Sequence, residues 1–279
     1  MNKHLLVLIS CCLILAGSSV ALAQETSPPP PNVLFIVREE IKPGRDAAHT
    51  EESNRYRQLL AKIKSPYGRI GMTPVAGNEH EVLYFWAMDS FAMLEKMNQD
   101  MEKWATGQYK ADFDAIAPGA EDNHVSQRDM VAVFRPDLSY QPGRNIPEMR
   151  YMLIETLRVR PGQSMNFMNA AKMYLDGLKK GNTDTHFAMF QVMSGAPEGL
   201  YLVIEPMKSL AELDSLQERY KSFREAMGPE GLKNLDKAAS EIFNPGESSI
   251  YAFNPRMSYV LDSFAARDKS SPAFWNPKP

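Results

Sequence analysis

The segment EIKPGRD at residues 40–46 decides the fold, because it returns 118 positions later as RVRPGQS at 158–164. Two further pairs of segments follow in the same order, 119 positions apart: SFAML at 90–94 with SLAEL at 209–213, and FRPDLSY at 134–140 with FNPRMSY at 253–259. Three matches in one order indicate an internal duplication. The sequence therefore predicts two copies of one structural unit.

Each copy has the predicted order strand, helix, strand, strand, helix, strand. The strands of the first copy are expected at 33–39, 69–75, 82–88 and 130–134. Asp46 and its counterpart Ser164 predict the N-cap of the first helix. In the second copy, Ser209 and Glu212 have the spacing of a capping box, and GPEG at 228–231 predicts a break in the second helix.

A unit of this order is a ferredoxin-like plait, whose sheet carries helices on one face and leaves the other bare. The tandem plait and its strand-[KR]-P-G-x-[DS]-helix opening resemble the dimeric α+β-barrel superfamily, which includes NIPSNAP-like proteins, antibiotic-biosynthesis-type monooxygenases and chlorite-dismutase-like proteins. The expected fold class is α+β: two tandem ferredoxin-like βαββαβ units whose antiparallel sheets pack face to face as a pseudo-dimeric α+β barrel. Because this superfamily contains many chemistries, the resemblance implies a fold and no single reaction.

The N-terminus has the pattern of a secretory signal: Lys3, an apolar run at 5–16, and the small-residue end Ala21-Leu22-Ala23. We expect export to the periplasm or out of the cell, with removal of Cys11 and Cys12. Without cysteine, thiolate chemistry is excluded. The predicted division lists a signal peptide at 1–23, a Pro-rich linker at 24–32, the first repeat at 33–140, a connector at 141–151, the second repeat at 152–259 and a C-terminal tail at 260–279.

Composition limits the partners. The 279 residues are 44% hydrophobic and 23% charged, with a formal net charge of −3. This is the balance of a globular protein without the basic excess of a nucleic-acid binder. Beyond the signal, no apolar run approaches the length of a membrane span. We expect a small-molecule ligand, no nucleic acid, no membrane span, and either a monomeric pseudo-dimer or a homo-oligomer.

Two carboxylates of the second copy are the first site candidates. Glu155 stands where the first copy has Val37, and Glu205 stands where it has Trp86. Their strands are central neighbours in a plait, so the two side chains are expected on one face. Two carboxylates in an apolar cavity would raise one pKa and form an acid/base site. The alternative is that Arg38, Arg158 or backbone donors satisfy both charges.

His49 is the third candidate. It lies on the sheet-facing side of the first helix, where the second copy has Phe167. One interpretation is a general base or an axial haem ligand between helix and sheet, where the resemblance places the pocket; the other is a hydrogen-bonded core histidine. Chlorite-dismutase-like proteins carry their haem histidine on a helix of the second half, whereas this chain has only His186 there, at a predicted strand start. Haem is therefore disfavoured, and no cofactor is expected.

No metal site is expected from the sequence. Residues 79–81, Glu-His-Glu, fall at a predicted hairpin, where consecutive side chains point in alternating directions. His124 is predicted in a solvated polar loop. The familiar hydrolase, zinc-protease and nucleotide-binding motifs are absent from the sequence.

Three functions remain open. The leading hypothesis is that the protein binds a small apolar or aromatic ligand in an α+β-barrel pocket, with walls from Tyr56, Tyr84, Trp86 and Tyr201. The second is a cofactor-independent monooxygenase-type enzyme with His49 as its base. The third is a NIPSNAP-like structural or interaction module with a filled core and no ligand. On strand three, the face of Leu83 and Phe85 is expected to pack against the helices.

Overall fold

The computed structural model describes residues 28–277, so the predicted signal peptide lies outside the described residues. The first unit comprises β1 (Val33–Ile41), α1 (Asp46–Ile63), β2 (Ile70–Ala76), β3 (Glu81–Met88), α2 (Phe91–Thr106), α3 (Lys110–Asn123) and β4 (His124–Phe134). The second comprises β5 (Tyr151–Val159), α4 (Ser164–Lys180), β6 (Ala188–Ser194), β7 (Leu200–Met207), the 3-10 helix η3 (Leu210–Ser215), α5 (Leu216–Ile242), β8 (Phe243–Asn244) and β9 (Ser248–Phe253). A short helix α6 (Asp262–Ala265) follows.

Eight strands close into one barrel, and all their pairings are antiparallel. Within the first unit the order is β4-β1-β3-β2, and within the second it is β9-β5-β7-β6. The units join at both edges, through β2 with β9 and β4 with β6. Each plait therefore covers the open sheet edges of the other, and the expected α+β barrel is confirmed within one chain.

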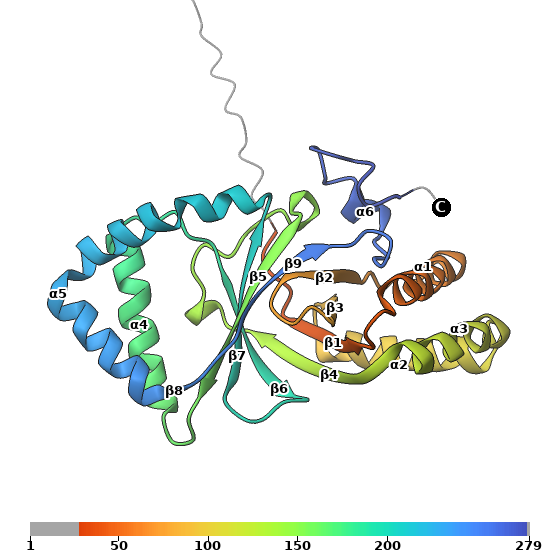
Figure 1. The fold of residues 1–279 in the computed structure, drawn as a ribbon, viewed down its shortest axis with the longest axis horizontal. Helices are drawn as coiled ribbons and strands as arrows, with labels where there is room; N and C mark the ends of the chain where they lie inside the picture. The colour runs from red at the N-terminus through yellow and green to blue at the C-terminus, as the bar shows by residue number, and fades with distance from the viewer. Residues whose placement is uncertain (1–27, 278–279) are drawn as a thin grey trace, which may run out of the picture.

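The helices form two layers on opposite sides of this barrel (Figure 1). Helices α1, α2 and α3 cover the strands of the first unit, and α4 and α5 cover those of the second. A buried apolar cluster fills the barrel, and a separate cluster lies under each helical layer. No described helix is long and apolar enough to cross a bilayer.

The prediction of which face of β3 and β7 packs against the helices was wrong, because the two faces are exchanged. Leu83 and Phe85 lie in the barrel interior in one cluster with Leu202, whereas Tyr84 and Trp86 lie under the helices. Both faces are apolar because one meets the other unit and one meets helices. Alternation alone therefore could not tell which face points inward.

The repeated Pro-Gly turn has the same backbone in both units. Gly44 has φ +78° and Gly162 has φ +79°, the left-handed region that favours glycine. The prediction that Asp46 and Ser164 are N-caps was wrong, because both are the first residues of their helices. The N-cap positions are Arg45 and Gln163, and neither makes a side-chain cap hydrogen bond. The repeated motif therefore acts through its turn.

The start of the second helix differs between the units. Ser90 caps α2 by accepting a hydrogen bond from the Met93 amide at 3.2 Å. The predicted capping box of Ser209 and Glu212 was wrong, because Ser209 makes no cap bond and the Glu212 carboxylate accepts from the Lys208 amide at 2.6 Å. The predicted break at Gly228 is confirmed, since φ is +66° within α5.

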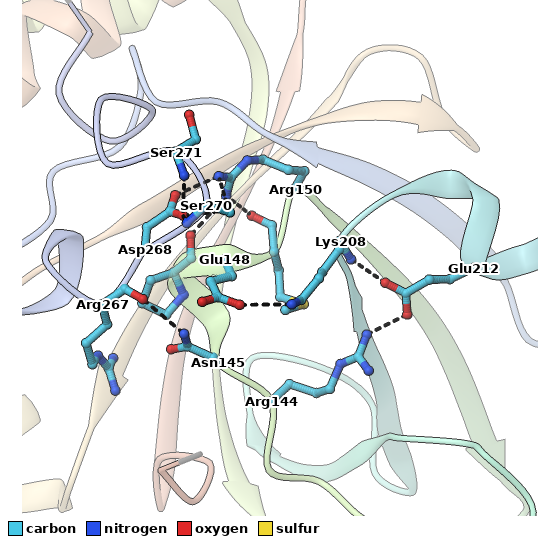
Figure 2. Close-up of polar contacts among 12 residues, drawn as sticks. Arg144, Asn145, Glu148, Arg150, Lys208, Glu212, Arg267, Asp268, Ser270 and Ser271 are labelled. Atoms are coloured by element: carbon cyan, nitrogen blue, oxygen red, sulfur yellow. Dashed lines mark hydrogen bonds and ion pairs between the residues drawn. The ribbon is translucent and has the colours of Figure 1, made fainter. Parts of the chain in front are cut away.

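The connector and the C-terminal segment are tied together at one end of the barrel (Figure 2). The Arg150 guanidinium pairs with Asp268 at 2.6 Å, and the Asp268 side chain is fully buried. Lys208, the residue that follows β7, pairs with Glu148 at 2.9 Å. Trp275, also buried, donates to the Pro147 carbonyl at 2.8 Å and packs on Phe253. The segment after β9 is thus part of the core.

Candidate functional site

A cavity of about 400 Å³ lies between α4, α5 and the outer face of β5, β6 and β7. Most of its wall is apolar or aromatic, including Phe167, Tyr174, Phe187, Phe223 and Phe243. Such a volume and wall match the range and character of small-molecule sites.

Glu155 and Glu205 enter this cavity from two neighbouring strands. Along the β5–β7 ladder Glu155 lies opposite Val203, and Glu205 lies opposite Leu153. All four residues line the cavity, which places both carboxylates on the face under the helices. The structure therefore brings together the two carboxylates that alternation along the strands predicted to share a face.

The two carboxylates have different surroundings. Glu205 pairs with Arg219 of α5 at 2.7 Å, and both side chains are largely buried. Glu155 has no hydrogen-bond or ion-pair partner among the described residues, and its side chain is exposed to the cavity. Desolvation raises the pKa of Glu155, and the nearby Glu205 charge raises it further. Arg219 satisfies Glu205 and no described residue satisfies Glu155, so the alternative in which Arg38, Arg158 or backbone donors satisfy both carboxylates was wrong.

Arg219 was missed because it lies outside the strands. The break at Gly228 bends α5, so both arms of the helix reach the cavity. Arg219 and Tyr220 come from the first arm, and Leu235 and Ala239 from the second. The spacing of Arg219 four residues before Phe223, on the buried side of the helix, is the sequence signal that could have found it.

The equivalent space in the first unit is filled by side chains. Arg69 stacks on the rings of Tyr56 and Tyr84, with the guanidinium carbon 4.4 and 4.3 Å from the ring centroids, and lies 5.8 Å from Trp86. The repeat places Val203 at the position of Tyr84, and Glu205 at that of Trp86. Smaller side chains on β7 thus leave the second unit hollow.

The predicted ligand-binding residues do not meet at one place. Tyr56, Tyr84 and Trp86 form the stack around Arg69, whereas Tyr201 packs on Phe167 in the other unit, with ring centroids 4.7 Å apart. Burial raises the pKa of Tyr56 and of Tyr84. These three side chains of the first unit pack around Arg69 and fill the space under the helices.

His49 also lies away from the second-unit cavity. Its side chain is 2% exposed, and its Nε2 atom lies 2.8 Å from Glu39 Oε2 and 3.4 Å from the Tyr84 hydroxyl. His124 stands beside it; the predicted solvated loop was wrong, because His124 is the first residue of β4 and its side chain is 12% exposed. Glu81, expected at a solvated hairpin, is buried and pairs with Arg38 and Tyr251 inside the barrel end.

A second cavity, of about 360 Å³, opens at the barrel end near residues 28–31. Its wall is again apolar, with Phe85 and Phe190 from the barrel interior. The charged side chain Arg144 at its rim is paired with Glu212 (Figure 2). Asp89 and Arg267 also line this cavity, but it has no pair of carboxylates on neighbouring strands like Glu155 and Glu205, so it is the weaker candidate.

Haem, which the superfamily resemblance implies for some members, does not fit the cavity of the second unit. No residue lining that cavity is a histidine. His186 contacts the Gln141 carbonyl and the Asp184 carboxylate, both at 3.0 Å, at the edge of the barrel. The cavity therefore offers no histidine ligand for an iron.

No family model and no curated protein matches this sequence. Among solved structures, an anthrone oxidase-like protein aligns over 81% of this chain and 94% of its own, at 13% identity and a TM-score of 0.47. A chlorite dismutase variant from Candidatus Nitrospira defluvii, in complex with cyanide, aligns over 81% and 92%, at 7% identity and a TM-score of 0.45. Likenesses this distant carry no inference about activity. The order of its own strands shows one closed α+β barrel built from two tandem plaits in a single chain.

Proposed function

We propose that the protein binds a small aromatic ligand carrying a cationic or hydrogen-bond-donating group in the cavity under α4 and α5. The observation that carries the proposal is the unpartnered Glu155 carboxylate inside an aromatic cavity of about 400 Å³. An aromatic ring in this space would replace water against the apolar wall, which is the main source of affinity in such sites.

The polar groups would set the orientation of the ligand. Arg219 is already paired with Glu205, so the charged group of the cavity that is available to a ligand is the Glu155 carboxylate. An ammonium or hydroxyl group on the ligand would give this carboxylate the hydrogen-bond or ion-pair partner that the protein does not supply. The rings of Tyr174 and Tyr220 on the wall would favour a cation further. An anionic ligand would face Glu155 and Glu205 together and should be rejected.

The test uses three naphthalene probes of equal ring size: 2-naphthylmethylamine, 2-naphthalenemethanol and 2-naphthoate. Fluorescence titration at neutral pH should give the order amine, then alcohol, then acid, with at least about tenfold between amine and acid. Glu155→Gln should remove the advantage of the amine and leave the alcohol nearly unchanged.

A matched control is Glu247→Gln, which changes an exposed carboxylate of the loop before β9 outside this cavity. It should leave the order of the probes unchanged. The proposal fails if none of the three probes binds, or if Glu155→Gln and Glu247→Gln have the same effect on the amine.

A second candidate is proton abstraction by Glu155, favoured by its raised pKa. A carboxylate with a pKa moved toward neutrality is a better general base than an ordinary one. The test is NMR-detected exchange of the acidic C–H protons of 2-tetralone in deuterated buffer. Faster exchange with the wild-type protein than with Glu155→Gln would support catalysis, and equal rates would leave binding alone.

We also propose that the chain is exported, on the strength of the signal pattern at 1–23. The mass of the protein recovered from its own cells tests this. Cleavage after Ala23 is expected, and an intact N-terminus would contradict export by this route.

A further inference from the structure

A buried cluster in the first unit takes no part in the proposed ligand site. Glu39 of β1, His49 of α1 and His124 of β4 meet under the helices, and their potential ligand atoms all lie within 4.8 Å of one another. Glu39 Oε2 lies 2.8 Å from His49 Nε2 and 3.4 Å from His124 Nε2. Two strands and one helix thus bring two imidazoles and one carboxylate close together.

A β-bulge brings His124 to this point. Along the β1–β4 ladder Glu40 pairs with Ser126 but Ile41 pairs with His124, so Val125 is the extra residue. Regular alternation from Val131 and Val133, which pack under the helices, would place Val125 on that side and His124 on the other. The bulge exchanges them: Val125 is 57% exposed and His124 lies beside Glu39. Bulges commonly re-aim a side chain in this way.

The cluster holds a polar atom that the protein does not satisfy. His124 Nε2 is buried and has no hydrogen-bond partner among the described residues, although it faces the Glu39 carboxylate. A buried nitrogen without a partner costs free energy. A pure His49–Glu39 ion pair would give no reason to bring a second imidazole nitrogen to the same carboxylate.

We propose that Glu39, His49 and His124 bind a divalent transition-metal ion, with Zn²⁺ the best match. Two histidines and one glutamate are an established zinc ligand set, and tetrahedral ligands at zinc distances lie about 3.3 to 3.6 Å apart. The separation of 3.4 Å between His124 and Glu39 already has this value. The separation of 2.8 Å between His49 and Glu39 would widen by about half an ångström as the ion replaces their hydrogen bond.

The surroundings are compatible with a cation. The Tyr84 hydroxyl lies 3.4 Å from His49 Nε2, so a further oxygen stands beside the cluster. The Arg69 guanidinium stacks on the Tyr84 ring, and the Glu39 and Glu52 carboxylates act on the same tyrosine. Two carboxylates and one guanidinium therefore act on this tyrosine beside the cluster. An ion here would join β1, α1 and β4 and would stabilise the folded state by binding it selectively.

The experiment titrates the full mature chain, stripped with a chelator, with Co²⁺ alone and then with Zn²⁺ alone. One Co²⁺ per chain with the visible absorption of tetrahedral coordination is expected, and Zn²⁺ should displace it. Zn²⁺ should also raise the melting temperature. His124→Gln should weaken uptake by at least about tenfold and abolish the thermal shift. Because the His124 side chain is partly exposed, this variant is expected to fold, which circular dichroism checks.

His186→Gln is the matched control, since it removes a histidine of the other unit. It should bind Co²⁺ as the wild type does. Glu39→Gln, which keeps the size of the side chain, should lose uptake as His124→Gln does. The proposal is overturned if the wild type takes up no ion, if uptake survives in both cluster variants, or if His186→Gln loses it equally.

Discussion

The two helix–sheet interfaces of this molecule come from one duplicated unit but are built differently. In the first unit Tyr84 and Trp86 fill the space under the helices and surround Arg69. In the second, Val203 and Glu205 occupy the same two positions and a cavity of about 400 Å³ remains. One interface is solid and carries a buried histidine pair; the other is hollow and carries an unpartnered carboxylate.

This difference shows that two copies of one unit can keep the same fold with different packing under their helices. The fold needs both interfaces to cover the barrel, but only one needs dense packing. A hollow interface loses dispersion contacts, which lowers stability. The solid unit and the strand pairing between units hold the barrel together, and the space in the hollow unit is where we propose that the ligand binds.

The largest expected effect comes from hollowing the solid unit. Trp86→Ala removes a side chain that is 6% exposed and packs on Phe35 and Tyr84. It should lower the free energy of unfolding by about 3 to 5 kcal/mol in urea denaturation. Val203→Ala, which faces the existing cavity, should cost clearly less, about 1 kcal/mol. Equal losses in the two variants would mean that the interfaces are packed alike.

The next effect comes from filling the hollow unit. Val203→Tyr gives the second unit the residue that the first has at Tyr84, and its ring should project into the cavity. The affinity for 2-naphthylmethylamine should fall at least about tenfold, because the ring and the probe compete for one volume. Met165→Tyr on the exposed side of α4, where the residue is 73% exposed, should leave affinity unchanged. Undiminished binding to Val203→Tyr would place the ligand elsewhere.

The smallest effect is a pH dependence of stability. The pKa of Glu155 is raised above its usual 4.5 in the folded state, so folding favours its protonated form. That contribution is present below the unfolded pKa and is lost as pH rises through the folded pKa. Glu155→Gln should therefore gain stability relative to the wild type as pH rises from about 4 toward neutrality. Urea denaturation across this range measures the difference; a constant difference between the two proteins would show that the pKa is not raised.

Much of the fold could be read from residues 40–46 and their copy. The repeat supplied the unit, its strand order and the closure of two units, because a plait cannot stay bare on one face. Which face of β3 points into the barrel could not be predicted, since Phe85 and Trp86, on opposite faces, are both large and apolar. Helix α3 and the long start of β4 were also missed, because residues 110–129 are mostly polar on both faces.

The part of the candidate site that follows from the alternation of side chains along regular strands could be predicted. Glu155 and Glu205 were placed on one face because they sit on neighbouring strands. Arg219 was missed because it lies on a helix outside the strands, although its four-residue spacing from Phe223 marks the buried side of that helix. The position of His124 depended on a one-residue bulge, which is a departure from regular geometry that periodicity cannot reveal. The cavity itself follows from the smaller Val203 and Glu205 in place of Tyr84 and Trp86, which is visible only when the two copies are compared.

The crystal structure of the protein grown with 2-naphthylmethylamine tests the central claim most directly. We expect one probe per chain under α4 and α5, with the ring against Phe167 and Phe223 and the ammonium group beside Glu155. The first-unit stack around Arg69 should be unchanged. A probe in the barrel-end cavity, or a cavity that remains empty at saturating probe, would contradict the account.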